Sequence, residues 1–294
     1  MECLRHGITT VQDMCTVVPL DEATLDVTLA AYREVGIRVV FSIGLRDIGE
    51  LDISPFMPAD TPQAVQDVVR GTPGNARADL AFVERQIARY SPSPASLLHW
   101  GLSPSGPQRS SRTLLEGVAD LARRRGLPIF THVYETKAQA AKARRIYEAQ
   151  GGSMIRHMDE LGLLGPATTL AHGVWLSQSE IELLAGSGTN VAHNPVSNMK
   201  LKNGIAPIRG LRDAGVTVAL GCDNCSCSDC QNIFQAMKMF CLLAAVADPE
   251  PTGLHARHVI EAATLGGARA VGLHGKVRRH SRRHGCGSRA DRSR

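Results

Sequence analysis

The sequence predicts an α/β protein, a TIM-like (β/α)8 barrel that lacks its first strand. Three observations support this prediction. Apolar, β-branched runs alternate with amphipathic runs along nearly the whole chain, as is typical of parallel sheets with crossover helices. The 294 residues, 43% of them hydrophobic, fit one barrel of about 250 residues. Polar residues recur where the later apolar runs end, at the face where the loops of a barrel converge.

Seven strands can be located along the chain. They are predicted near Val11, Val39, His99, Phe130, Leu170, Val191 and Val218. Helices are predicted over residues 21–35, 64–90 with a break at 72–74, 111–125, 137–150, 154–164, 177–185, 205–214, 232–246 and 256–271. Asp21 and Ser111 can cap the first turns of two helices, because their side-chain oxygens accept from free backbone N–H groups. Residues 51–62 are predicted to form a Pro-rich loop. The missing strand is then the first, which would precede Met1.

The net charge of +5 is concentrated in one segment. Residues 276–294 hold seven Arg and one Lys against a single Asp, so the rest of the chain is mildly acidic. This distribution does not favour a nucleic-acid partner. The sequence shows neither a long apolar run nor a charged start followed by an apolar segment, so we expect no membrane span, no secretory signal and a cytoplasmic location.

Histidine and carboxylate residues mark the ends of four successive strands. His132 and Glu135 follow one apolar run, and His172, His193 and Asp223 end the next three. We expect these side chains to meet, because the carboxyl ends of barrel strands share one face. Imidazoles and carboxylates bind divalent metals and transfer protons. The recurrence predicts a metal-dependent hydrolase, with the alternative that a single strand-end histidine only bonds neighbouring backbone.

Four motifs in order carry a resemblance to a known family. They are His132–Thr136 (HVYET), Ala171–Leu176 (AHGVWL), Ala192–Leu201 (AHNPVSNMKL) and Leu220–Asp223 (LGCD). They resemble the signatures of strands five to eight in the amidohydrolase superfamily, in the branch that holds cytosine, guanine and methylthioadenosine/adenosylhomocysteine deaminases and triazine hydrolases. The resemblance covers residues 1–277 as one barrel domain. It implies hydrolysis of an exocyclic C–N bond on a small purine, pyrimidine or triazine-like heterocycle, and it leaves homo-oligomerisation open.

The resemblance also implies a role for each strand-end residue. His132 and Asp223 would bind one divalent metal ion, zinc or iron. Asp223 would also take a proton, Glu135 would carry protons to the ring nitrogen and the leaving amine, and His172 would orient the attacking water or polarise the substrate. His193 is interpreted as structural, and Trp175 and Met199 as core residues. Residues expected to contact the substrate are Gln108, Arg109, Asn194, Ser197 and Asn198.

Substrate type is less constrained by the motifs. Nucleoside deaminases of the branch resemble one another in carrying a His after strand four, where this chain has Ser105. This difference favours a free base or a related heterocycle over an adenosine-type substrate.

Two departures from the family pattern lead us to expect weak activity or none. The family carries an H-x-H pair of metal ligands on its first strand, and this sequence contains no H-x-H. Two or three remaining ligands should bind metal poorly. The accessory β-sandwich is also missing from the predicted elements. The alternative function, suggested by the cysteines around Asp223, is a non-catalytic metal-binding or regulatory protein derived from an amidohydrolase barrel.

The basic segment 278–294 forms a second region. It lacks apolar periodicity, and a one-base shift can read GAIAAGMAADLVLIDR, close to the family's continuation. We interpret the segment as a disordered tail or a frameshift product, with an acidic-partner site as the alternative.

Four cysteines crowd around Asp223. Cys222, Cys225, Cys227 and Cys230 lie within nine residues, whereas structural zinc sites usually use two separated C-x-x-C pairs. We interpret them as loop thiols, with a second metal site as the alternative.

Overall fold

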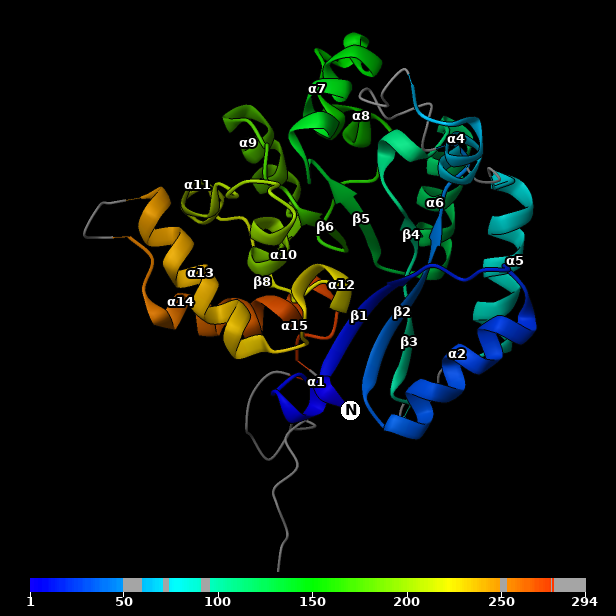
Figure 1. Cartoon of the computed structure of the whole chain (residues 1–294), viewed down its shortest axis with the longest axis horizontal. Helices are drawn as coiled ribbons and strands as arrows, with labels where there is room; N and C mark the ends of the chain where they lie inside the picture. The colour runs from blue at the N-terminus through cyan, green and yellow to red at the C-terminus, as the bar shows by residue number, and fades with distance from the viewer. Residues whose placement is uncertain (50–59, 71–73, 91–95, 249–252, 276, 278–294) are drawn as a thin grey trace, which may run out of the picture.

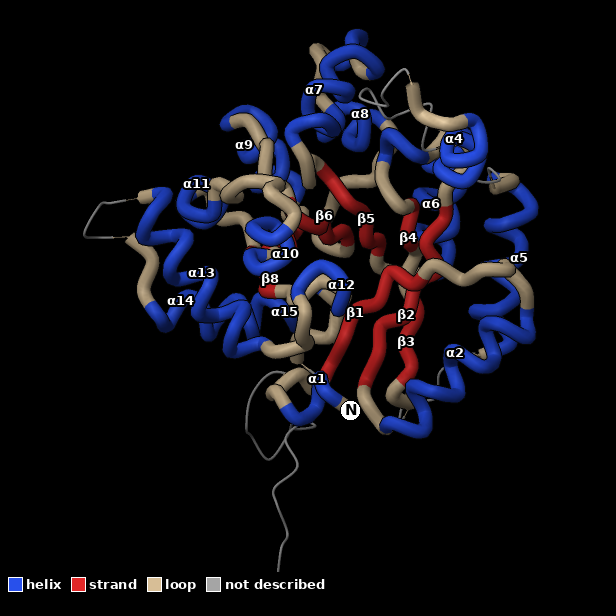
Figure 2. The backbone as a smooth tube through the Cα atoms, viewed as in Figure 1, coloured by secondary structure: helices blue, strands red, loops and turns tan. Residues whose placement is uncertain are grey.

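The computed structural model describes residues 1–49, 60–70, 74–90, 96–248, 253–275 and 277. Strands lie at its centre and helices surround them (Figures 1 and 2). The strands are β1 Thr10–Cys15, β2 Arg38–Leu45, β3 Leu98–Trp100, β4 Ser103–Pro104, β5 Ile129–Val133, β6 Thr168–His172, β7 Asn190–His193 and β8 Val218–Leu220. All seven predicted strands are confirmed, and the short β4 is an addition.

The strands form two parallel sheets that are joined at one place. One sheet has the order β1-β2-β3, with β4 also pairing with β2, and the other has the order β5-β6-β7-β8. A parallel bridge between Leu102 and Ile129 connects them. The N–H of Phe130 donates to the Leu102 carbonyl at 2.8 Å. The sheets therefore make one curved run, in which β3 and β4 share a strand position. In the described part of the chain, no strand ladder joins β8 to β1.

The predicted helices are present with shifted ends, most of them shorter than predicted, whereas α9 and α13 extend past their predicted ends. They are α1 Glu2–Arg5, α2 Glu22–Val35, α4 Gln63–Arg70, α5 Ala76–Arg89, α6 Arg112–Arg125, α7 Lys137–Ile146, α8 Met154–Glu160, α9 Gln178–Ser187, α10 Pro195–Lys200, α11 Ile208–Asp213, α12 Cys225–Ser228, α13 Ile233–Ala247, α14 Ala256–Glu261 and α15 Gly267–Ala270, with 3-10 turns η1 Pro107–Arg109 and η2 Glu148–Gln150 and a π turn η3 Ala262–Gly266. Asp21 accepts from the N–H of Thr24 at 2.8 Å and Ser111 from that of Leu114 at 3.2 Å, which confirms both caps. Most of the predicted Pro-rich loop and all of the basic segment lie outside the described residues.

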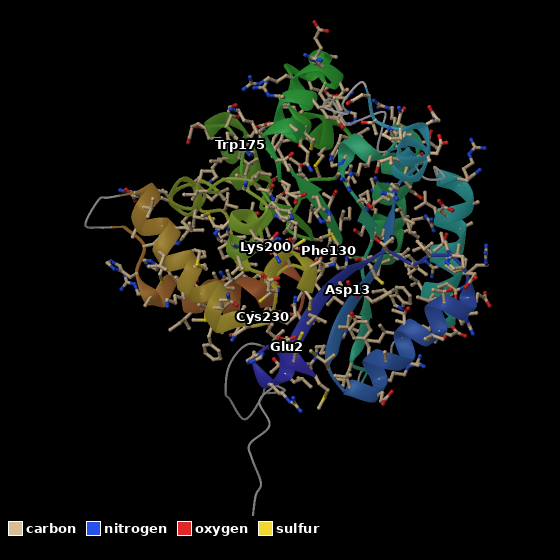
Figure 3. All side chains as sticks on the ribbon, viewed as in Figure 1. Glu2, Asp13, Phe130, Trp175, Lys200 and Cys230 are labelled. Carbon is tan, nitrogen blue, oxygen red and sulfur yellow. The ribbon has the colours of Figure 1, made fainter. Side chains whose placement is uncertain are left out.

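A small apolar cluster packs between the two sheets. Val40 of β2, Phe130 of β5 and Leu273, beyond α15, pack together and are at most 5% exposed. Figure 3 shows Phe130 among the central strands. The hydroxyl of Thr169 donates to the Ala270 carbonyl at 2.7 Å and ties this segment to β6. Burial of one such side chain stabilises the fold by about 1.5–3 kcal/mol.

Two residues assigned to the core lie at the surface instead. Trp175 is 39% exposed and Met199 is 44% exposed, so that interpretation was wrong. The indole N–H of Trp175 donates to the Asn203 carbonyl at 2.9 Å, which holds the ring across the loop after α10. The ring therefore lies at the surface and is anchored there by its polar N–H. Over the described residues, no helix has the length and apolar character needed to cross a membrane.

Candidate active site at the carboxyl ends of β5 to β8

His132 projects from β5 with its ring held by backbone. Its Nδ1 lies 2.8 Å from the carbonyl oxygen of Ser105. A carbonyl only accepts, so Nδ1 carries the proton and Nε2 presents a free lone pair. Burial, and secondarily the nearby His172, lowers the pKa of His132. The ring is therefore neutral, the form in which imidazole binds a metal.

His172 is the last residue of β6 and is 1% exposed. Its ring stacks on that of His132, with 5.4 Å between centroids and 24° between planes. Its Nδ1 lies 2.9 Å from Oδ1 of Asn198 in α10. The sequence thus places the two imidazoles on adjacent strands, and the barrel brings their faces together.

Asp223 follows β8 and faces the second histidine. One carboxylate oxygen lies 3.9 Å from Nε2 of His172, and the other accepts from the N–H of Asn224 at 2.7 Å. Gly221 makes room for this strand end, because a Cβ there would meet Oδ1 of Asn194 at 2.2 Å. His132, His172 and Asp223 consequently line one edge of the second sheet, as predicted.

Backbone conformation is unusual at these strand ends. Tyr134, His172 and Asp223 adopt φ values of 49°, 74° and 64°, a left-handed region that L-residues with a side chain rarely occupy. Such conformations cost on the order of 1–3 kcal/mol each and cluster at functional sites. Three of them beside the predicted residues support a functional role for this face.

Glu135 is held by two amide side chains. Nε2 of Gln139 donates to one carboxylate oxygen at 3.4 Å, and Nδ2 of Asn203 donates to the other at 3.2 Å. Sequence reasoning missed both amides, as well as the Ser105 carbonyl behind His132. Gln139 lies four residues after Glu135, a spacing that could have indicated the contact. Asn203 is 68 positions from Glu135 and meets it only in the fold, so the sequence gives no signal for it.

The residues predicted to contact substrate divide into two groups. Gln108, Asn194, Ser197 and Asn198 are at most 7% exposed. Within the described residues, Oε1 of Gln108, Oγ of Ser197 and Nδ2 of Asn198 have no hydrogen-bond partner. Leaving such an atom buried costs about 1–3 kcal/mol, so these atoms suit a polar ligand. The backbone oxygen of Arg109 accepts from the N–H groups of residues 47 and 48 at 3.2 Å, which anchors the loop.

His193 is fully enclosed. It is 1% exposed and its ring meets Phe240 edge-on at 5.2 Å between centroids. Burial lowers its pKa to about 3, so the ring stays neutral. This environment agrees with the structural role expected for His193.

The cysteines near Asp223 are all free thiols. Cys222 is buried, and burial raises its pKa to about 12, whereas Cys225 is exposed. The segment packs against α1 through the N–H of Gln231, which donates to the Glu2 carboxylate at 3.2 Å; Figure 3 labels Glu2 and Cys230 in this region. His132 and His172 of the candidate site lie on β5 and β6, so the cysteine segment does not carry them.

The described side chains at the site do not form a complete set of metal ligands. No group of three or more His, Cys, Asp or Glu side chains, among the residues the structure describes, is placed so that it could hold a metal. His132 and Asp223 have suitable chemistry, but a catalytic zinc usually takes three protein ligands. The described residues alone therefore do not fit a complete metal site.

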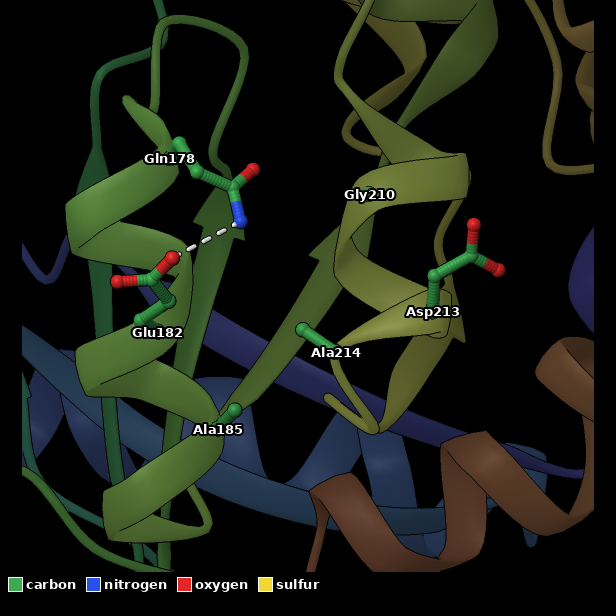
Figure 4. A pocket seen from close by; sticks show the side chains of 6 residues that line it. All are labelled: Gln178, Glu182, Ala185, Gly210, Asp213 and Ala214. Carbon is green, nitrogen blue, oxygen red and sulfur yellow. Dashed lines mark hydrogen bonds between the residues drawn. The ribbon is translucent and has the colours of Figure 1, made fainter.

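Two cavities lie near the outer helices. One of about 530 Å³ lies between α9 and α11 (Figure 4) and includes none of the predicted site residues. It is lined by Gln178, Glu182, Ala185, Gly210, Asp213 and Ala214. The other, of about 260 Å³, includes Tyr134, Arg144, Arg156 and Trp175. It adjoins the strand ends of β5 and β6 through Tyr134 and Trp175.

Comparison with known proteins agrees with this geometry. The model of the amidohydrolase family matches residues 1–278. The chain is 33% identical over 273 residues to 5'-deoxyadenosine deaminase of Methanothermobacter thermautotrophicus, covering 93% of this chain and 56% of that protein. It is 34% identical over 273 residues to 5-methylthioadenosine/S-adenosylhomocysteine deaminase of Thermococcus onnurineus, covering 93% and 57%. The chain thus spans little more than half the length of these relatives.

Solved structures give the same assignment. A zinc-bound adenosine deaminase from Xanthomonas campestris matches with a TM-score of 0.78 and 26% identity, over 94% of this chain and 55% of that one. Atrazine chlorohydrolase from Arthrobacter aurescens, complexed with zinc, matches with a TM-score of 0.80 and 26% identity, over 92% and 57%. The parallel barrel, the ordered strand-end residues and these matches together show that the chain belongs to the amidohydrolase family.

Proposed function

We propose that the protein is a metal-dependent hydrolase that removes an exocyclic amine from a small nitrogen heterocycle. The observation that carries this proposal is the convergence of His132, His172 and Asp223 at one edge of β5–β8. Glu135 lies just beyond β5 and is held by amides rather than by a cation. A carboxyl group in this position suits proton transfer to a ring nitrogen.

His132 and Asp223 are proposed as ligands of one divalent ion, zinc or iron. The neutral ring of His132 offers Nε2, and the zinc in the two related structures supports a divalent metal for the family. Two protein ligands are fewer than zinc usually takes, so the proposed site needs a further donor beyond the described set. His172 is proposed to orient the reacting groups, and Asp223 to accept a proton.

The substrate is proposed to be an amino-substituted purine, pyrimidine or triazine. The named relatives favour an adenosine-type compound, whereas Ser105 in place of the His of the nucleoside deaminases favours a free base or a related heterocycle. Gln108, Arg109, Asn194 and Ser197 are the proposed contacts, together with the free amide nitrogen of Asn198. Two statements remain predictions: that residues 1–277 form one barrel domain, and that the protein is cytoplasmic.

Metal content and ammonia release test the proposal together. Purified protein and His132→Ala would be loaded with zinc or iron, and bound metal per chain measured by elemental analysis. Ammonia release would then be followed from 5'-deoxyadenosine, adenine, guanine, cytosine and an aminotriazine. We expect at most one weakly held ion per chain, lost on substitution, and turnover of at least one compound. Metal binding without turnover would instead support the second candidate, a non-catalytic metal-binding protein, for which the free thiols around Asp223 are further candidate ligands.

A further inference from the structure

One short segment reaches both groups that are proposed to handle protons. Asn198 in α10 bonds to the ring of His172 at 2.9 Å, and Asn203, just after α10, donates to the carboxylate of Glu135 at 3.2 Å. The two asparagines are 0% and 4% exposed. Since His172 ends β6 and Glu135 follows β5, the segment spans two neighbouring strand ends.

The two asparagines are fixed relative to each other by backbone contacts. The N–H of Asn203 donates to the Asn198 carbonyl at 2.8 Å, and the Asn203 carbonyl accepts from the indole of Trp175 at 2.9 Å. Lys202 and Gly204, on either side of Asn203, have φ values of 58° and 116°. The turn therefore fixes the backbone of Asn203 from both directions, and its buried side chain points to the Glu135 carboxylate.

The contact to His172 has a chemical consequence. With Oδ1 of Asn198 as the acceptor, Nδ1 of His172 carries the proton and Nε2 presents a lone pair toward Asp223. His132 is in the same state through the Ser105 carbonyl. Both stacked rings then present unprotonated Nε2 atoms. The opposite amide orientation would place the proton on Nε2, and an experiment can distinguish the two.

We propose that Asn198 and Asn203 are positioning residues for the acid–base pair. Asn198 sets the tautomer of His172, and Asn203 sets the direction of the Glu135 carboxylate. This inference rests on the proposed function, because that proposal assigns the acid–base roles to His172 and Glu135. Its test needs neither metal nor substrate. A protein without deaminase activity can still show the predicted tautomer, so the two proposals can fail separately.

The tautomer of His172 can be measured directly. Protein labelled with ¹⁵N-histidine would be examined at pH 8 by long-range ¹H–¹⁵N NMR, which distinguishes Nδ1–H from Nε2–H rings. His172→Gln identifies the resonance by its loss. We expect Nδ1–H in the unaltered protein and in Asn198→Asp, which keeps an acceptor. We expect a mixture or Nε2–H in Asn198→Leu, which has a similar shape but no acceptor.

Met199→Ala is the matched control, because Met199 lies on the same helix and is 44% exposed; its spectrum should match the unaltered one. An Nε2–H ring in the unaltered protein would overturn the assignment, and this measurement does not depend on any variant folding. An unchanged tautomer in Asn198→Leu would overturn it as well.

The role of Asn203 is tested by a double-mutant cycle. The free energy of unfolding would be measured in denaturant for Asn203→Leu, Glu135→Gln and the pair. We expect a non-additive loss, because the Glu135 carboxylate loses its amide donor in the first variant. Strictly additive losses, like those expected for Met199→Ala with Glu135→Gln, would remove Asn203 from the proposal.

Discussion

The two sheets of the barrel use their carboxylates in opposite ways. In the β1–β4 sheet, Asp13 accepts from the hydroxyl of Tyr32 at 2.5 Å, and Asp47, after β2, accepts from the N–H and hydroxyl of Ser111 at 2.7 and 2.5 Å. In the β5–β8 sheet, Asp223 instead faces His172 at 3.9 Å. The same strand–helix architecture therefore supports structural bonding in one half and a candidate active site in the other.

This difference shows that a carboxylate on or just after a strand does not by itself indicate a functional site. Asp13 is half-buried and burial raises its pKa, yet among the described residues its carboxylate bonds to the hydroxyl of Tyr32 in α2. The second sheet differs because it combines facing titratable groups, left-handed backbone and buried polar atoms without described partners. Function is indicated by the combination.

The largest expected effect is on catalysis. If Glu135 transfers protons, Glu135→Gln should lower the rate of ammonia release from metal-loaded protein by roughly 10²–10⁴-fold. The thermal unfolding midpoint should fall only slightly, because the amide in this variant keeps one of the two acceptor oxygens that Gln139 and Asn203 contact. Glu182→Gln, on the exposed face of α9, should keep the full rate. Equal rates in both variants would contradict the role assigned to the second sheet.

A pH effect on stability should be the next largest. The folded pKa of His193 is about 3, below its unfolded value near 6.5, so the unfolded chain binds the extra proton first. Stability from this group is complete above pH 6.5 and falls by about 1.4 kcal/mol per pH unit as pH drops from there toward 3. Denaturant unfolding between pH 8 and 4 should therefore show a shallower slope for His193→Gln than for the exposed His255→Gln control. Identical slopes would mean that His193 is protonated in the fold.

A substitution in the first sheet should change the free energy of unfolding and leave the rate of ammonia release unchanged. Asp47→Ala removes two hydrogen bonds to the cap of α6 and should cost about 1–2 kcal/mol in the free energy of unfolding. Ammonia release per folded molecule should stay unchanged. A loss of rate without a loss of stability would break the proposed contrast between the sheets.

The smallest expected effect is on stability, from an ion pair on the exposed face of α6. Arg112→Ala removes an exposed ion pair with Glu116 at 2.7 Å, one turn apart on α6. Such pairs contribute about 0.3–0.5 kcal/mol and are screened by salt. Unfolding in low salt should show a loss of this size that nearly vanishes at 1 M salt. A larger, salt-independent loss would indicate packing by the arginine stem.

Much of the fold could be predicted because its signals are local. The apolar runs at Val39, Phe130 and Leu170 identify strands by composition and length. Asp21 and Ser111 identify helix starts because a cap bonds within three residues. The short helices α10 and α12 were missed, since four to six residues carry too little periodicity to be recognised. Trp175 was misassigned to the core because its apolar ring gives no information about which side of a loop it covers.

By itself the sequence determined the barrel class, the order of its strands, and the family motifs that contain His132, Glu135, His172 and Asp223. These depend on residue type and on spacing along the chain. Only the tertiary structure decided which nitrogen of His132 is free, which amides hold Glu135, and that Asp13 and Asp47 serve structure. Apart from the contact of Glu135 with Gln139, four positions away, those properties depend on contacts between residues 19 to 68 positions apart. The physical reason is that hydrogen bonds act over about 3 Å in space, and only the folded chain sets that distance.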